Sequence, residues 1–206
     1  PESGAVETGP GKEAGASAFT FPKGPAAGTF LHGVLEQFDF QDPAAAGAAE
    51  SVADLLHRSG LAPYWAPLVC QWLAQVLDTP LLTGSDLRLR LLSKEDRLPE
   101  LAFHFALEGL EEATLNALLR EHGIPPVEMP QARVQGLMKG YIDLVFRHQG
   151  RFYLADYKSN YLGAAPADYR QENLARAMAG HRYDLQYLIY SVALHRYLGR
   201  RLIAYD

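Results

Sequence analysis

Apolar residues recur along this chain with two spacings, and each spacing predicts a different kind of element. From Thr29, apolar residues three and four apart follow a candidate N-cap and predict a helix. Further helices are predicted at residues 44–56, 66–77, 113–120 and 174–198. Strands are predicted at residues 87–92 and 101–107, and as a hairpin within residues 140–160. This order of helices, mostly antiparallel strands and a last helix predicts an α/β (mixed α+β) domain with a small sheet.

The same pattern suggests where the domain begins and ends. Residues 1–28 are rich in Gly, Ala, Pro, Ser and Glu, which predicts a flexible linker or tail before a domain at residues 29–206. The chain has no initiator methionine and stops where another element would begin, so we expect a C-terminally truncated fragment of a longer protein. No apolar run of about eighteen residues and no signal peptide occurs in the sequence.

Charge is distributed unevenly over the 206 residues. The net charge of -5 argues against a nucleic-acid binder, but residues 133–206 carry eleven Lys and Arg against six Asp and Glu. The basic part of the chain is therefore the part that contains the hairpin. The single cysteine, Cys70, lies among apolar residues, which favours a place in the core and excludes a thiolate metal cluster.

The hairpin, GYIDLVFRHQGRFYLADYKSN, carries charges where a sheet would favour apolar residues. Asp156 and Lys158 are two apart and so share one face of a strand. If residues 148–150 form the turn, Asp143 lies about as far before it as Asp156 lies after it, which predicts that the two carboxylates are near-neighbours across the strands. Paired carboxylates repel unless a cation lies between them, and oxygen ligands suit Mg²⁺. With a lysine beside them, the arrangement suits metal-assisted phosphodiester hydrolysis.

A surface hairpin with an Asp–Lys pair on its outer face is the simpler interpretation of a D-x-K motif alone. Two features favour a functional site. The surrounding residues are strongly apolar, which predicts central strands, and a G-x-x-D strand beside a D-x-K strand is rarer than either motif. These apolar neighbours are Ile142, Leu144, Phe146, Phe152 and Leu154.

Gly140-x-x-Asp143 followed by Asp156-Tyr157-Lys158 resembles the core of the PD-(D/E)xK nuclease superfamily. Residues 28–206 more closely resemble the C-terminal nuclease domains of the RecB family of helicase-nuclease subunits. The matching blocks are GTFLHGVLEQFDF, GYIDLVFRHQGRFYLADYKSN and HRYDLQYLIYSVALHRYL. The resemblance implies a restriction-endonuclease-like core, with a small central mixed sheet flanked by helices. It also implies a Mg²⁺-dependent DNA exo/endonuclease that cuts single strands delivered by a helicase, in double-strand break repair and homologous recombination.

The resemblance further implies roles for individual residues. His32, which lies off the centre of its helix's apolar arc, matches the family's metal-binding histidine and would join Asp143 and Asp156. The main-chain carbonyl of Tyr157 is a further implied ligand, and Lys158 is implied as catalytic together with the two aspartates. Because imidazole is a softer ligand than Mg²⁺ usually takes, Mn²⁺ is an alternative ion, and Ca²⁺ is expected to bind without supporting catalysis.

The last predicted helix contributes further candidates. Gln186 and Tyr190 are four apart and match the Q-x-x-x-Y motif of RecB-like nucleases, which implies a part in placing DNA or the catalytic lysine. From spacing alone, a tyrosine-rich packing face explains them equally. Arg182 is a candidate contact to the DNA backbone, although a solvated surface is the simpler explanation of such an arginine. Glu100 is a weaker candidate for a supporting acid.

The implied partners are single-stranded DNA, a helicase part of the same polypeptide and RecC- and RecD-like subunits, in the bacterial cytoplasm at the nucleoid. The sequence contains no phosphate-binding GK[ST] loop and so carries no ATPase of its own. An alternative function is a non-catalytic or dual-role module that docks the RecA recombinase. A stand-alone nuclease is a further alternative, but not one with an iron–sulfur cluster, which needs about four thiolates.

Overall fold

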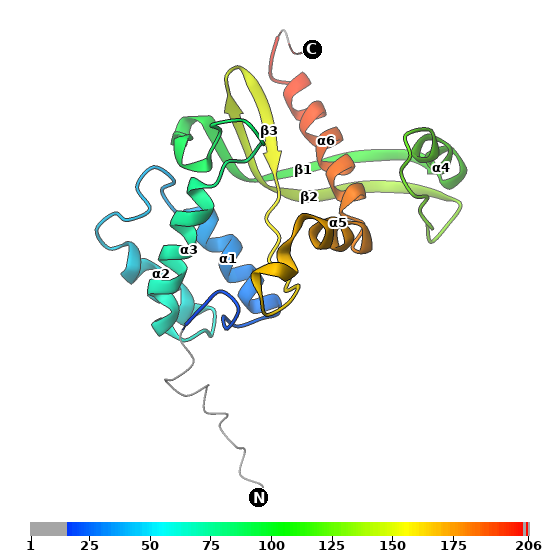
Figure 1. Ribbon diagram of the computed structural model, residues 1–206. Coiled ribbons are helices and arrows are strands. Elements are labelled where there is room, and N and C mark those ends of the chain that lie inside the picture. Colours follow the sequence, from blue (N-terminus) through cyan, green and yellow to red (C-terminus); the bar gives the residue numbers. More distant parts are fainter. Residues whose placement is uncertain (1–15, 204, 206) are drawn as a thin grey trace, which may run out of the picture. The chain divides into compact units, whose positions relative to one another are not determined.

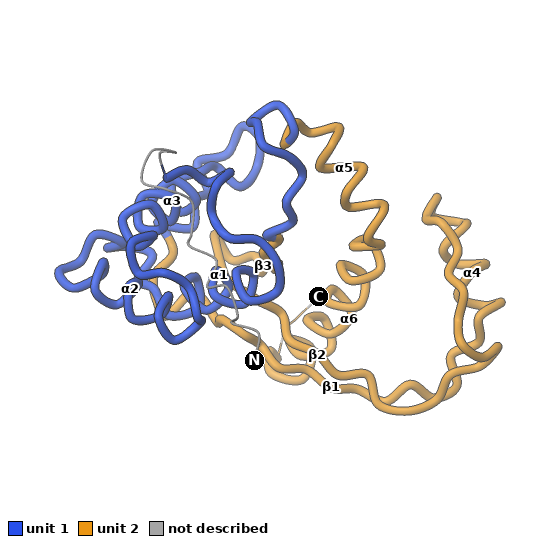
Figure 2. Tube along the Cα trace, turned by 90° about the horizontal axis from the view of Figure 1, so that it is seen from below, with its two compact units in different colours: residues 1–91, 159–168 blue, residues 92–158, 169–206 orange. Residues whose placement is uncertain are grey.

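The computed structural model describes residues 16–203 and 205, and its chain divides into two compact units (Figures 1 and 2). Unit 1 is formed by residues 1–91 and 159–168, and unit 2 by residues 92–158 and 169–206. The predicted tail falls largely on residues 1–15, which lie outside the described residues. Within the described part of the chain, no helix is long and apolar enough to cross a membrane.

Unit 1 contains three α-helices, each with buried apolar residues on one face. They are Pro25–Gln37 (α1), Ala48–Arg58 (α2) and Ala66–Asp78 (α3), with 3₁₀ turns at Pro63–Trp65 and Leu89–Leu91. Phe21 is buried and contacts the rings of Phe30, Trp65 and Trp72. The packed part of the chain therefore starts before α1.

Three predicted elements of unit 1 differ from the structure. α1 begins four residues before Thr29, because Pro25 fits the first turn of a helix, where its missing N–H costs no hydrogen bond. α2 begins after Gly47, whose left-handed backbone (φ 86°) marks the helix start. The predicted strand at residues 87–92 is wrong. Leu87 and Leu89 are buried around a 3₁₀ turn, so their spacing of two reflected burial and not pairing.

Unit 2 is built on an antiparallel sheet in the order β1-β2-β3. The strands are Arg97–Glu111 (β1), Arg133–His148 (β2) and Arg151–Ala155 (β3). Helix α4, Glu112–Glu121, connects the far ends of β1 and β2, and the unit closes with α5, Gln171–Gly180, and α6, Tyr183–Gly199. The predicted mixed α/β class is confirmed. Within the described residues, however, all strand pairings are antiparallel, where the resemblance implied a mixed sheet.

The core of unit 2 lies between the sheet and α6, which crosses the strands in Figure 1. Apolar residues of the two layers form one buried cluster: Leu101, Phe103, Ile142, Val145, Ala193, Leu194 and Leu198. Gly140 belongs to this packing, because a Cβ there would lie 2.7 Å from the ring of Phe103. Packing against Phe103 therefore explains why the first position of the G-x-x-D motif is a glycine.

The long helix predicted at residues 174–198 is wrong in one respect. It consists of α5 and α6, which are separated at His181 and Arg182. Arg182 has a left-handed backbone (φ 54°, ψ 39°), and one such residue interrupts a right-handed helix. The predicted end at Gly199 is confirmed.

Candidate active site

The β2–β3 hairpin brings the two predicted aspartates together. The strands pair from His148 with Arg151 back to Leu144 with Ala155, so the next positions in register are Asp143 and Asp156. Only Gln149 and Gly150 form the turn, one residue fewer than predicted, and both have positive φ as tight hairpin turns require.

The carboxylate of Asp143 is anchored to the backbone beyond β3. Its Oδ2 accepts a 2.7 Å hydrogen bond from the N–H of Tyr157, the residue after Asp156. The side chain of Tyr157 is itself largely buried, and this burial, with the charge of Asp143 adding to it, raises the pKa of its phenol. Tyr157 therefore stays a neutral packing residue, and its main-chain N–H orients one of the two carboxylates.

Lys158 contacts the second carboxylate directly. Its Nζ forms an ion pair with Oδ2 of Asp156, as expected for a D-x-K pair on one face. The side chains are 28% and 17% exposed, so water screens this pair less than it would a surface pair. Ile142 and Leu144 of the neighbouring strand are fully buried, which argues against the simpler interpretation of a decorated surface hairpin.

Helix α6 supplies a second contact to Asp156. Nε2 of Gln186 donates hydrogen bonds to Asp156 Oδ1 at 3.2 Å and to the hydroxyl of Tyr190 at 2.8 Å. The ring of Tyr190 packs edge-on against Phe103, with 5.8 Å between ring centroids. Burial raises the pKa of Tyr190, and the charges of nearby aspartates act in the same direction. Gln186 and Tyr190 therefore connect the packing against Phe103 to the carboxylate of Asp156. Direct contact of these two residues with DNA stays a prediction.

The first turn of α6 also contacts the lysine. Nζ of Lys158 lies 4.4 Å from the centroid of the Tyr183 ring, and this ring stacks with His181. A cation over the face of an aromatic ring is attracted by its negative π face. Neither Tyr183 nor its contact was predicted, because four tyrosines occur in this helix and spacing does not say which one faces Lys158.

Two carboxylates, one in β2 and one directly after β3, are a suitable donor set for Mg²⁺, which proteins usually bind through one or two carboxylates. Each already has one oxygen held by a hydrogen-bond donor, which fixes its orientation. Over residues 16–203 and 205, no group of three His, Cys, Asp or Glu side chains forms a candidate metal cluster. His32 belongs to α1 in unit 1, and its place in the ligand set stays a prediction.

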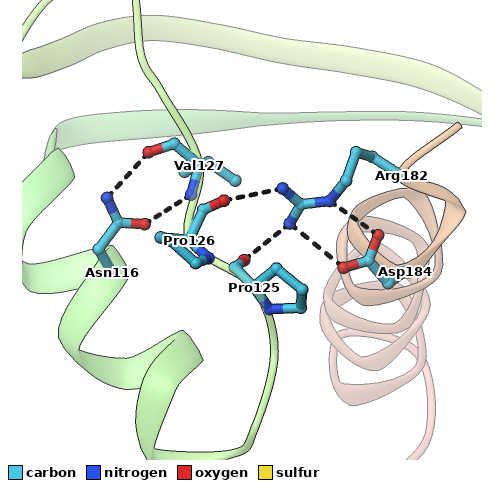
Figure 3. A network of polar contacts seen from close by, with 6 residues as sticks. All are labelled: Asn116, Pro125, Pro126, Val127, Arg182 and Asp184. Atoms are coloured by element: carbon cyan, nitrogen blue, oxygen red, sulfur yellow. Dashed lines mark hydrogen bonds and ion pairs between the residues drawn. The ribbon is translucent and has the colours of Figure 1, made fainter. Parts of the chain in front are cut away.

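Two further predicted residues have notable backbones. Glu100 lies opposite Asp143, since Pro99 pairs with Leu144 and Leu101 with Ile142. Its φ of 48° is unusual for a residue other than glycine, and no sequence pattern indicates it. Arg182, predicted to contact DNA, directs its guanidinium to main-chain carbonyls and to Asp184 (Figure 3). A role in binding DNA stays a prediction for it.

Comparison with known proteins agrees with the motifs. The sequence profile described as the PD-(D/E)XK nuclease superfamily matches residues 12–202. The RecBCD enzyme subunit RecB of Escherichia coli (strain K12) is 42% identical over 192 residues, which are 90% of this chain and 16% of that protein.

Other bacterial relatives give the same result. RecB of Haemophilus influenzae is 40% identical over 187 residues, or 90% of this chain and 15% of that protein. RecB of Mycobacterium tuberculosis (strain H37Rv) is 34% identical over 233 residues, covering 98% and 20%. The chain therefore corresponds to only 16% of the length of the Escherichia coli protein. Since the superfamily profile covers most of its length, the chain belongs to the PD-(D/E)XK nuclease superfamily.

Proposed function

We propose that this chain hydrolyses phosphodiester bonds of single-stranded DNA in a Mg²⁺-dependent reaction. The observation that carries the proposal is the set of contacts on Asp156. Lys158 contacts one of its oxygens, Gln186 the other, and Asp143 is fixed beside it through the N–H of Tyr157. Nucleases of this superfamily generally use a divalent metal, which fits two oriented carboxylates.

In this proposal each side chain has a distinct task. Asp143 and Asp156 hold the metal through their carboxylates, which the N–H of Tyr157 and the amide of Gln186 orient. The ion, when bound, polarises the phosphate and favours ionisation of water. Lys158 lies next to the carboxylates, where its amino group orients the attacking water and stabilises charge that develops on the phosphate. Gln186 holds Asp156 in one orientation.

The remaining ligands rest on the match to the family's motifs. We include His32 and the main-chain carbonyl of Tyr157 as further ligands, with Mn²⁺ as an alternative ion. Gln186 and Tyr190 are included as residues on the DNA side, and a contact of Arg182 with a DNA phosphate is an alternative use of its guanidinium. The nuclease domain is taken as residues 29–206.

The names of the relatives suggest a biological setting. They are subunits of RecBCD enzymes, so we propose that the chain acts with a helicase part of the same polypeptide and with RecC- and RecD-like subunits. The cut strands would be those released by the helicase during break repair and recombination. Docking of the RecA recombinase is an alternative function, which one chain could combine with cleavage.

The test is degradation of end-labelled single-stranded DNA by the wild type, Asp156→Asn and Lys158→Met, in Mg²⁺ and in Ca²⁺. Losing a carboxylate ligand or the charge of the lysine is expected to lower the rate by about 100-fold or more. Ca²⁺ is expected to give no cleavage. The exposed Asp86→Asn provides a control for loss of one carboxylate. Cleavage at the wild-type rate by folded Asp156→Asn would refute the proposal.

A further inference from the structure

Arg182 lies between α5 and α6 and reaches the loop that leads from α4 to β2 (Figure 3). Its Nη1 donates to the carbonyl of Pro126 and its Nη2 to that of Pro125, each at 2.8 Å. The Nε and Nη2 also bond the two carboxylate oxygens of Asp184 at 3.1 and 3.2 Å. All three nitrogens of the planar guanidinium are therefore used within the protein.

The loop that receives these bonds is fixed on its other side. The amide of Asn116 donates to the carbonyl of Val127 at 2.9 Å and accepts from its N–H at 2.8 Å. Asn116 belongs to α4 and is only 6% exposed, so the loop is bonded by a buried polar residue. Two consecutive prolines restrict the backbone just before Val127. The carbonyls that Arg182 contacts are thus held in place, and they fix the arginine in turn.

The backbone of Arg182 indicates that its side chain is needed there. With φ 54° and ψ 39°, it occupies the left-handed region that favours glycine, at the residue that precedes α6. An arginine at such a position is strained, and strained residues persist where the surrounding structure determines them. The four hydrogen bonds of its guanidinium hold Arg182 in this backbone conformation.

The first turn of α6 leads from Arg182 to the site. Tyr183, the first helical residue, lies against Lys158, and Gln186, one turn after Arg182, donates to Asp156. A helix is rigid over one turn, so the position of its first residue sets the position of both contacts. We propose that Arg182 is a positioning residue, which clamps the Pro125–Pro126 loop to the start of α6 and so holds Gln186 and Tyr183 against Asp156 and Lys158. This inference rests on the proposed function.

Steady-state cleavage of single-stranded DNA by Arg182→Ala and Arg182→Lys distinguishes positioning from contact with a phosphate. We expect kcat to fall about tenfold in both variants, since small misplacements of reacting groups are costly, with KM and its salt dependence unchanged. A lysine does not restore kcat, because one ammonium group lacks the fork that joins two carbonyls to Asp184. Arg176→Ala, which removes an exposed arginine of α5, is expected to behave as the wild type.

A phosphate contact gives the opposite result and would overturn the inference. Arg182→Lys would then stay near the wild type, and Arg182→Ala would raise KM and reduce the salt slope by about one phosphate. If Arg182→Ala does not fold, Arg182→Gly removes the guanidinium while allowing the left-handed backbone. Wild-type kcat in folded Arg182→Gly would also overturn the inference.

A double-mutant cycle with Gln186→Ala tests the path from Arg182 to Asp156. If the clamp acts through the first turn of α6, Arg182→Ala should lower kcat by clearly less than tenfold once Gln186 is absent, because only the contact of Tyr183 with Lys158 remains to be disturbed. A merely structural defect would add its full tenfold loss in both backgrounds and would contradict the inference. The proposed function is judged separately: inactive Asp156→Asn together with unaffected Arg182 variants rejects only the clamp, whereas active Asp156→Asn rejects the function.

Discussion

The two ends of the paired strands β1 and β2 are stabilised by different interactions. The inner end comprises residues 97–103 and 140–148, with β3 alongside, and carries the two aspartates. Ile142, Leu144 and Phe146 of this end are each no more than 3% exposed. The outer end comprises residues 104–139, which include α4 and the loop that follows it, and Leu137 there is 63% exposed.

Polar contacts, some of them partly buried, replace apolar packing at the outer end. Asn116 bonds both main-chain groups of Val127, the N–H of Met129 donates to Glu112, and Arg182 bonds two prolines. The difference shows a division of tasks within unit 2. Dense packing fixes the strands that carry the carboxylates, while directional hydrogen bonds fix the loop from which Arg182 positions α6.

The largest expected effect compares one apolar residue from each end of β2. Ile142→Ala removes a fully buried side chain from the core and should lower the free energy of unfolding by about 2–5 kcal/mol. Leu137→Ala, at an exposed position, should change it by less than about 0.5 kcal/mol. Urea unfolding monitored by circular dichroism measures both. Similar losses in the two variants would contradict the contrast between the ends.

A polar substitution should affect the outer end instead. Asn116→Ala leaves the N–H and carbonyl of Val127 without their side-chain partner and should cost about 1–3 kcal/mol of unfolding free energy. It should also speed amide hydrogen exchange at Val127, with little change in the strands of the inner end. The exposed Gln135→Ala is the control, for which no change in exchange is expected. Faster exchange at Val145 in Asn116→Ala would show that the ends are not independent.

The first turn of α6 joins the two ends, because Arg182 contacts the outer end and Tyr183 the inner one. Tyr183→Leu removes the ring under Lys158 and is expected to lower kcat about two- to tenfold, the effect of a cation–π contact of modest strength. Tyr183→Phe keeps the ring and should retain kcat. Equal activity of the Leu and Phe variants would show that the ring does not position the lysine.

The inner end was predictable from sequence to a large extent. Alternating apolar residues indicated the strands, and the similar distances of Asp143 and Asp156 from the turn predicted that the two are neighbours. The sequence distance of a residue from the turn predicts its partner on the other strand, because the turn sets the register of a hairpin. The contact from Gln186 to Asp156 was implied only through the family motif, since spacing does not reveal which face of a helix meets a strand.

The outer end was largely unpredictable for a physical reason. Arg182 bonds main-chain carbonyls, and every residue has one, so no residue type in the loop identifies the acceptors. Its left-handed backbone also splits the predicted helix without the glycine that usually marks such a position. The wrong strand at residues 87–92 has a related cause, because a spacing of two records buried leucines whether or not a partner strand exists.

The smallest expected effect concerns two Asp–Arg pairs, one on each end. Hydrogen bonds from Arg182 hold the pKa of Asp184 below its usual range, and those from Arg147 do the same for the pKa of Asp96. A carboxyl whose pKa is lower in the folded state stabilises the fold above its unfolded pKa, and this contribution fades as the pH falls below about 4. The side chain of Asp184 is 31% exposed, so Asp184→Asn should cost at most about 1 kcal/mol at neutral pH and progressively less in acid. Thermal unfolding between pH 7 and pH 3 measures this loss, and kcat separates the pairs: Asp184→Asn should lower it by loosening the clamp, whereas Asp96→Asn should not. A fall in kcat with Asp96→Asn alone would assign the positioning of the site to the packing of the inner end.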